Sequence, residues 1–235
     1  MICIVNFKTL MDFELQLKWL NDIANEEINF KLLIAPTLPL KNTHNNYEII
    51  SQNIAGLTRT VGEISGSVLQ YENIKYAIIG HLERRKILNE DSAIINQRLK
   101  SCFAFDITPI ICLGMHSGPD LVVRELKSIV KNVELTNRNI IIVYESKKST
   151  LNGQAEYSFI EMQAVLKYLK EYITSLNKKH KGPRSVKYIM GGHVDEIGVQ
   201  VANRLGYDGV LIGDRYKTVE AIEPVLVELN KLQKA

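Results

Sequence analysis

The chain has 235 residues, of which 46% are hydrophobic. That is enough to bury one large core, so we expect a single domain over residues 1–235. Its 29 basic and 26 acidic side chains leave a formal net charge of +3 and no basic run that could follow a phosphate backbone, which argues against nucleic acid as a partner. The apolar start stops at Asn6, far short of the roughly 20 apolar residues of a membrane span, so neither export nor a membrane is expected.

Short apolar runs rich in β-branched residues recur along the chain and predict eight strands, at residues 2–6, 31–35, 49–53, 76–80, 108–113, 140–145, 187–191 and 209–213. These runs lack the strict alternation of half-exposed antiparallel strands, which is typical of parallel strands covered on both faces. Apolar residues with helical spacing predict helices over residues 13–23, 94–102, 121–130, 159–169 and 219–229.

Strands that alternate with helices predict right-handed βαβ units and a parallel sheet. Eight units fill the chain, as in a (β/α)₈ barrel of roughly 250 residues. The second unit has little room for a helix, because Pro36, Pro39 and the polar stretch 41–47 follow its strand. An open doubly wound sheet is the structural alternative, but no Gly-x-Gly-x-x-Gly pattern follows the first strand to support a dinucleotide cofactor.

The three cysteines, Cys3, Cys102 and Cys112, lie within or beside apolar runs. An odd number of cysteines in such positions is typical of buried free thiols in a reducing compartment. We therefore expect a cytoplasmic protein with no disulfide and no metal site.

In a barrel of parallel strands, chemistry takes place on the loops at the carboxyl ends of the strands. The residues that end the predicted strands are Asn6, Lys8, Asn53, His81, Glu83, Glu145, Gly191, Gly192, His193, Gly213 and Asp214. Position alone thus selects a lysine, a histidine and a carboxylate from three different strands. Side chains of these types are suited to proton transfer.

One of these strand ends carries a specific motif. Residues 80–85 read Gly-His-Leu-Glu-Arg-Arg, which resembles the Gly-His-Ser-Glu-Arg-Arg signature of the triosephosphate isomerase family. Further matches follow in the family's order along essentially the whole chain: Asn-Phe-Lys at 6–8, Ala-Pro at 35–36, Gln-Asn at 52–53, Gly-Glu-Ile-Ser at 62–65, Ile-Cys-Leu-Gly at 111–114, Tyr-Glu at 144–145, Gly-Gly at 191–192 and the eighth strand at 208–213.

The resemblance implies an aldose–ketose isomerase of a small phosphorylated sugar, without cofactor or metal. This reaction needs a base for a carbon-bound proton, an electrophile for the carbonyl oxygen and a positive charge near the enediolate. By the resemblance, Glu145 is the base, Lys8 supplies the charge, and His81 is the electrophile, a role carried over from the family, in which this histidine is a neutral imidazole. The substrate-binding residues that the family implies are Asn6, Lys8, Glu83, Gly153, Gly191, Gly192, His193, Gly213 and Asp214.

The chain departs from the family where the substrate phosphate is held. The lid after the catalytic glutamate, residues 146–154, keeps only Gly153 of the family's pattern, and lid closure excludes water and protects the enediolate. Asp214 stands where the family has the second glycine of an anion-binding nest. A carboxylate that faces this nest should repel phosphate unless Arg215 or Lys217 offsets its charge.

Two more departures concern loops. Val61 lies in a shortened loop, residues 54–61, where the family has a threonine that enters the neighbouring subunit's active site. The resemblance implies a homodimer, but without this interlocking contact a monomer or a different dimer stays open. The stretch after Gly114, residues 115–119, is abbreviated and lacks the glutamate that the family places there. Three functions stay open: a triosephosphate isomerase, an isomerase of a different (phospho)sugar, and a degenerate barrel that binds a ligand with little turnover.

Overall fold

The computed structural model describes residues 1–9, 11–41, 44–145 and 158–234. The strands in these ranges are β1 (Ile2–Asn6), β2 (Lys31–Ala35), β3 (Glu48–Ile49), β4 (Tyr76–Ile79), β5 (Thr108–Leu113), β6 (Asn139–Glu145), β7 (Ser185–Gly191) and β8 (Gly209–Ile212). The helices are α1 (Phe13–Ile23), α2 (Gly66–Tyr71), α3 (Leu82–Ile87), α4 (Ser92–Ala104), α5 (Pro119–Ile129), α7 (Phe159–Asn177), α8 (Glu196–Leu205) and α9 (Val219–Lys234).

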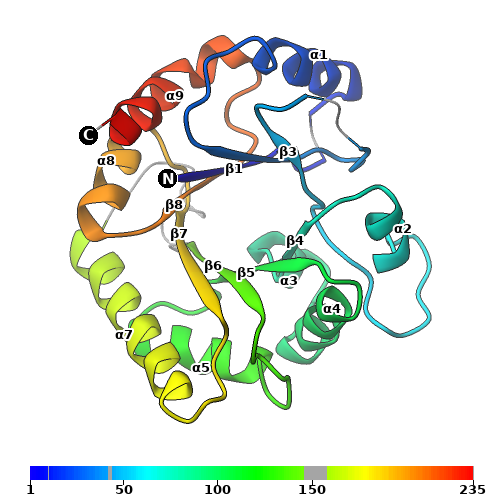
Figure 1. Cartoon of the computed structure of the whole chain (residues 1–235), viewed down its shortest axis with the longest axis vertical. Coiled ribbons are helices and arrows are strands. Elements are labelled where there is room, and N and C mark those ends of the chain that lie inside the picture. The colour runs from blue at the N-terminus through cyan, green and yellow to red at the C-terminus, as the bar shows by residue number, and fades with distance from the viewer. Residues whose placement is uncertain (10, 42–43, 146–157, 235) are drawn as a thin grey trace.

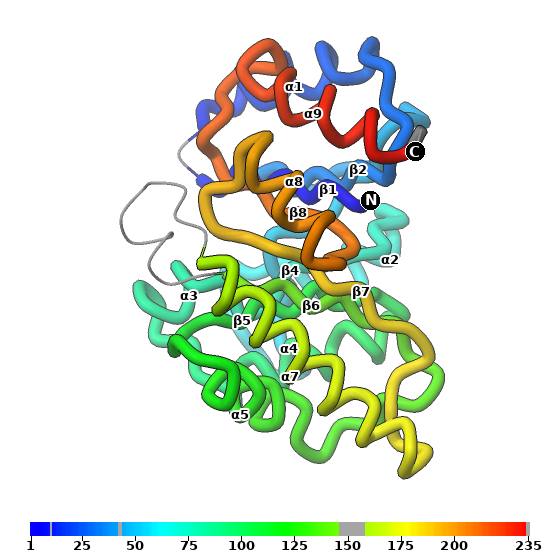
Figure 2. Tube along the Cα trace, turned by 90° about the vertical axis from the view of Figure 1, so that its left-hand side faces the viewer, coloured from blue at the N-terminus to red at the C-terminus, as the bar shows by residue number. Residues whose placement is uncertain are grey.

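The strands form one parallel sheet in the order β3-β2-β1-β8-β7-β6-β5-β4. The two ends of this order meet at Ser51, whose N–H donates to the Tyr76 carbonyl at 3.0 Å and whose carbonyl accepts from the Ile78 N–H at 2.9 Å. The sheet therefore closes into a ring with the helices outside it, which confirms the predicted (β/α)₈ barrel (Figure 1). Viewed from the side, α1 and α9 lie together at one end of the molecule, and α5 and α7 at the other (Figure 2).

The third strand is shorter than predicted. The sequence predicts a strand over residues 49–53, but β3 covers Glu48–Ile49, and beyond it only Ser51 pairs with β4. The hydroxyl of Ser51 donates to the Asn53 carbonyl at 2.5 Å, so the chain turns where a strand would have to stay extended. The described residues between β2 and β3 form no helix, as expected for the second unit.

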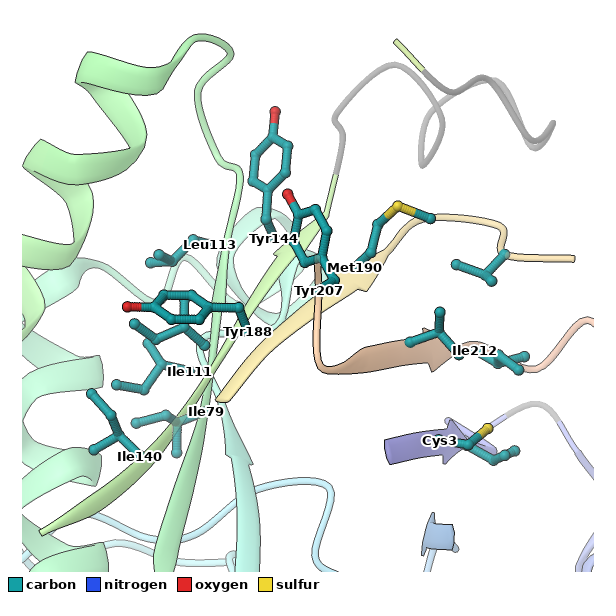
Figure 3. Packing of buried hydrophobic residues seen from close by; sticks show 14 of the residues in the cluster. Cys3, Ile79, Ile111, Leu113, Ile140, Tyr144, Tyr188, Met190, Tyr207 and Ile212 are labelled. Carbon is teal, nitrogen blue, oxygen red and sulfur yellow. The ribbon is translucent and has the colours of Figure 1, made fainter. Parts of the chain in front are cut away.

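Successive side chains of each strand face two different cores, because side chains alternate along a strand with a period of two. The inner core fills the barrel with Ile4, Leu33, Ala35, Ile50, Ile78, Ile110, Cys112, Ile141, Val143, Ile189 and Leu211. The outer core packs the other strand residues against the helices, and Figure 3 shows Ile79, Ile111 and Tyr144 among them. Both faces of the sheet are thus apolar, which explains why the sequence runs do not alternate.

Aspartate side chains fix the beginnings of several helices by accepting hydrogen bonds from N–H groups that have no partner within the helix. Asp91 accepts from the N–H groups of Ala93 and Ile94, both at 2.9 Å, where α4 begins. Asp12 and Asp195 cap α1 and α8 in the same way. The five predicted helices are all present, but two extend well past their predicted ends: α7 continues to Asn177 and α9 to Lys234.

Candidate functional site

Two polar side chains lie at the carboxyl end of the barrel, directly above the inner core. In β1, Asn6 comes two residues after the inner-core residue Ile4, and in β6, Glu145 comes two residues after Val143. Because the side-chain period of a strand is two, Asn6 and Glu145 project on the barrel side of the sheet. Both are buried, with 4% of each residue exposed. The register of the strands therefore brings polar groups to the face where barrels carry their chemistry.

Two glycines lie beside the functional side chains, and one of them makes room for Glu145. A Cβ atom on Gly191, at the end of β7, would lie 2.9 Å from Cγ of Glu145. A Cβ atom on Gly213, which follows β8, would lie 3.4 Å from Cε of Lys8. Glycine is thus used at Gly191 because the glutamate side chain crosses directly over it.

The predicted histidine and glutamate face each other. His81 caps α3, and its Nδ1 accepts a hydrogen bond from the N–H of Glu83 at 3.4 Å. Since Nδ1 is an acceptor, the proton of a neutral imidazole lies on Nε2. Nε2 is 3.8 Å from Oε2 of Glu145, and 6% of His81 is exposed. This separation is too long for a hydrogen bond, so neither group is engaged in a hydrogen bond with the other.

The carboxylate of Glu145 is suited to accept a proton. Its Oε1 is buried and has no hydrogen-bond partner among the described residues. The thiol of Cys112 lies beside this carboxylate, and burial together with the charge and hydrogen bond of Glu145 raises the pKa of Cys112 well above its ordinary range. Cys112 is therefore a neutral thiol, and the base next to it keeps a free acceptor atom.

Lys8 is fixed through both its backbone and its ammonium group. The backbone has a φ of 53°, and the carbonyl accepts hydrogen bonds from Thr37 Oγ1 at 3.0 Å and from Gln52 Nε2 at 2.8 Å. The Nζ atom lies 2.6 Å from Oε1 of Glu83 and 3.4 Å from Oδ1 of Asp214. The ammonium group thus stands between two carboxylates, one from α3 and one from the loop after β8.

These ion pairs set the protonation states at the mouth of the barrel. Burial by itself lowers the pKa of Lys8, but the hydrogen bond and charge of Glu83, together with Asp214, outweigh it and raise that pKa above its ordinary value. For the carboxyl group of Asp214, burial acts in the opposite direction and raises the pKa. The charges of Lys8 and Lys217 outweigh this effect, so the pKa of Asp214 lies below its ordinary value. Lys217 Nζ is 3.6 Å from Oδ2 of Asp214, so it offsets this carboxylate as the sequence suggested.

The loops after β7 and β8 contact each other. Gly192 and His193 have positive φ values of 98° and 48°. Arg215 donates to the carbonyl of His193 at 3.5 Å, and the Tyr216 hydroxyl donates to the carbonyl of Val194 at 3.4 Å. Arg215 is thus directed to the neighbouring loop, whereas Lys217 pairs with the carboxylate. Gly153 and the predicted lid, residues 146–154, lie outside the described residues.

A cavity opens beside the lysine and the histidine. It has a volume of about 200 Å³, and its walls include Asn6, Lys8, His81 and Glu83. A second cavity of about 640 Å³ shares Thr9, Gln52, Arg84 and Leu88 with the first. Four of the predicted site residues therefore surround one space, which a small ligand could enter.

Sequence reasoning missed several residues that support the site. Thr37 and Gln52 both donate hydrogen bonds to the carbonyl of Lys8. The sequence indicated Gln52, through the Gln-Asn match at 52–53, but gave no sign of Thr37. Glu125 of α5 accepts a hydrogen bond from the N–H of Gly114 at 3.3 Å. A carboxylate of the helix that follows β5 thus turns back to the backbone beside Met115, and no motif in the sequence pointed to this contact.

Three further observations on the described residues concern membrane spans, metal ligands and cysteines. In these ranges, no helix has the length and apolar character needed to cross a membrane. No group of three or more His, Cys, Asp or Glu side chains in the same part of the chain is placed to hold a metal ion. Cys3, Cys102 and Cys112 are buried free thiols.

Comparison with a family model and with known proteins points to one family, triosephosphate isomerase. The family model described as triosephosphate isomerase matches residues 1–227. A triosephosphate isomerase of Orientia tsutsugamushi (strain Ikeda) is 27% identical over 250 residues, covering 98% of each chain. A triosephosphate isomerase of Acaryochloris marina is 30% identical over 195 residues, covering 77% of each chain, and one of Mycoplasma genitalium is 30% identical over 156 residues, covering 65% of this chain and 63% of the relative.

Proposed function

Because the chain belongs to the triosephosphate isomerase family, we propose that it interconverts dihydroxyacetone phosphate and D-glyceraldehyde 3-phosphate. The observation that carries this proposal is the placement of His81 Nε2 at 3.8 Å from Oε2 of Glu145, with both side chains buried. A base and an electrophile at this spacing can act on neighbouring atoms of one small substrate.

The proposed reaction uses three side chains. Glu145 takes a proton from C1 of dihydroxyacetone phosphate, and the electrons of the broken C–H bond form an enediolate. Nε2–H of His81 donates to the carbonyl oxygen, and the imidazole then moves a proton between the two oxygens. Lys8 stabilises the negative charge by electrostatic attraction. Glu145 finally returns its proton to C2, which yields the aldehyde, so no redox partner or other reactant is needed.

Substrate binding is proposed for the residues around this centre. Asn6 accepts a hydrogen bond from the backbone N–H of Lys8 at 3.0 Å and so lines the cavity next to it. Glu83 orients the lysine through its 2.6 Å contact. We assign Gly153, Gly191, Gly192, His193, Gly213 and Asp214 to the side of the substrate that carries phosphate, on the family pattern.

The test is a coupled isomerase assay with glyceraldehyde 3-phosphate, with a Glu145→Ala variant measured in parallel. We expect turnover by the wild-type chain and a loss of roughly 100-fold or more in the variant, because the variant lacks the base. Equal turnover in both would remove Glu145 from the mechanism. A folded wild-type protein without turnover would argue against this function.

One observation favours a second candidate, an isomerase for a different (phospho)sugar. Asp214 places a negative charge 3.4 Å from the Lys8 ammonium, at the strand end where the family holds the substrate phosphate. A substrate with less negative charge at that end would meet less repulsion. Comparing kcat/KM for phosphorylated and unphosphorylated hydroxy-carbonyl substrates separates the two candidates.

Asp214 also gives a prediction about affinity. Replacement by glycine, Asp214→Gly, should tighten the binding of substrate and of inorganic phosphate by about tenfold, which corresponds to about 1.4 kcal/mol of lost repulsion. Inhibition constants for phosphate, measured for the wild type and the variant at two salt concentrations, test this. An unchanged constant would mean that the carboxylate does not act on the ligand.

The chain is also proposed to act as a homodimer in the cytoplasm. Apolar side chains are exposed near the two cavities: 97% of Val61, 73% of Ile87 and 55% of Leu88 is accessible. Apolar residues gathered in this way are typical of protein interfaces, and a second copy of the chain would cover them. The three buried free thiols fit a reducing compartment.

The dimer proposal is tested by the variant Val61→Asp. A charge in an apolar interface without a partner should weaken association at least about tenfold. Sedimentation velocity over a range of concentrations measures this, with Tyr71→Asp as an exposed control outside the two cavities. A wild-type protein that stays monomeric at all concentrations would contradict the proposal.

A further inference from the structure

A buried carboxylate outside the proposed catalytic set connects two elements of the site. Glu125 lies on α5 with 6% of its surface exposed. Its Oε1 pairs with the guanidinium of Arg85 on α3, and its Oε2 accepts from the N–H of Gly114 at 3.3 Å. One side chain thus contacts the helix that follows His81 and the loop that follows β5.

Gly114 in turn lies directly against the catalytic strand. A Cβ atom on Gly114 would be 2.1 Å from the carbonyl oxygen of Glu145, and the φ of Gly114 is 124°, a conformation that other residues rarely adopt. The backbone of Gly114 therefore touches the backbone of Glu145. A shift of Gly114 would move the end of β6, where the base is attached.

The Arg85 side of the ion pair with Glu125 is connected to His81. Arg85 belongs to α3, and the N–H of Arg85 donates to the His81 carbonyl at 3.2 Å. His81 is the residue that begins this short helix. The Arg85–Glu125 ion pair therefore holds α3 at a fixed distance from the loop that supports Glu145.

We propose that Glu125 is a positioning residue that sets the separation between His81 and Glu145. This inference rests on the proposed isomerase function, because the separation matters for proton transfer. In this proposal Glu125 acts through its contacts with Arg85 and with the loop at Gly114, and it does not touch the substrate.

The surroundings of Glu125 argue for this role over a purely structural one. The other buried residues of α5 are apolar, among them Val122, Leu126 and Ile129. An apolar side chain at position 125 would pack with them, and a buried ion pair is often no more stabilising than apolar residues of similar size. Burial raises the pKa of Glu125 although Arg85 opposes the shift, so the site bears a desolvation cost. A carboxylate offers two acceptor atoms for two donors, which an apolar side chain cannot.

The test is the isosteric variant Glu125→Gln, because an amide has one acceptor oxygen and must turn its NH₂ toward one of the two donors. A misplacement of about 1 Å can reduce a rate about 100-fold, so we expect kcat to fall about tenfold or more while KM changes less than about threefold. The isotope effect on kcat with C1-deuterated dihydroxyacetone phosphate should rise, since proton transfer becomes slower than product release. Asp120→Asn, on the exposed side of α5, is the control.

The outcomes separate this inference from the proposed function. If the wild type turns over and the glutamine variant matches it in kcat and isotope effect, the inference is wrong and the function stands. If the wild type shows no turnover, the function fails, and a crystal structure of the variant decides: an altered distance between His81 Nε2 and the Glu145 carboxylate supports the positioning role, and an unchanged distance overturns it. Should Glu125→Gln not fold, Arg85→Lys is measured in its place with the same expectations, because lysine keeps the charge but not the planar fork.

Discussion

Replacing Glu145 by aspartate should lower kcat by roughly 100-fold or more, while KM changes far less. The shorter side chain withdraws the carboxylate by about one C–C bond from a partner that now stands 3.8 Å away at His81 Nε2. The chain cannot follow this change, because the Glu145 carbonyl is packed against Gly114 and its Cγ against Gly191. The charge remains, so substrate still binds, but the base is out of place in the transition state.

Steady-state kinetics in both directions test this prediction. Glu171→Asp on α7, an exposed glutamate with a 3.9 Å ion pair to Lys167, is the matched control and should leave kcat unchanged. A Glu145→Asp enzyme with wild-type turnover would mean that another group removes the proton. A proportional rise in KM with constant kcat would assign Glu145 to substrate binding.

The sequence predicts the parts of this site that depend on strand register. Asn6 and Glu145 follow inner-core residues by two positions, so an apolar run that ends in a polar residue indicates where that residue projects. The histidine is located by a different local feature: it comes directly after Gly80, whose φ of 73° turns the chain at the end of β4. Local rules decide these positions, and local rules can be read from a sequence.

The remaining features depend on residues that are far apart in the chain. Asp214 was expected near a phosphate nest, but its contact with Lys8 joins the loops after β8 and β1, which are neighbours only in the closed barrel. The length of β3 depends on the hydrogen bond of Ser51, which competes with an extended strand. Such contacts arise from the tertiary arrangement, and no spacing along the sequence encodes them.

The second large effect is expected for His81→Asn, which should lower kcat by roughly 10²- to 10⁴-fold, the usual contribution of a general acid–base group. Asparagine suits this test because it is a favoured residue at the beginning of a helix, so it can replace Nδ1 as the acceptor for the Glu83 N–H, now donated at 3.4 Å. Its amide is too short to reach the position of Nε2 and cannot exchange a proton between two oxygens near neutral pH.

The same variant separates catalysis from folding. Because the helix cap is retained, the free energy of unfolding should change by less than about 1 kcal/mol, and urea denaturation measures this. Leu82→Ala, next in the chain and buried without a polar contact to the site, is the opposite control: it should lose stability and keep most of its turnover per folded molecule. If His81→Asn retained wild-type kcat, the imidazole would be a helix cap only, and the electrophile would have to be sought in the Lys8 ammonium, the other polar hydrogen donor of the proposed catalytic set.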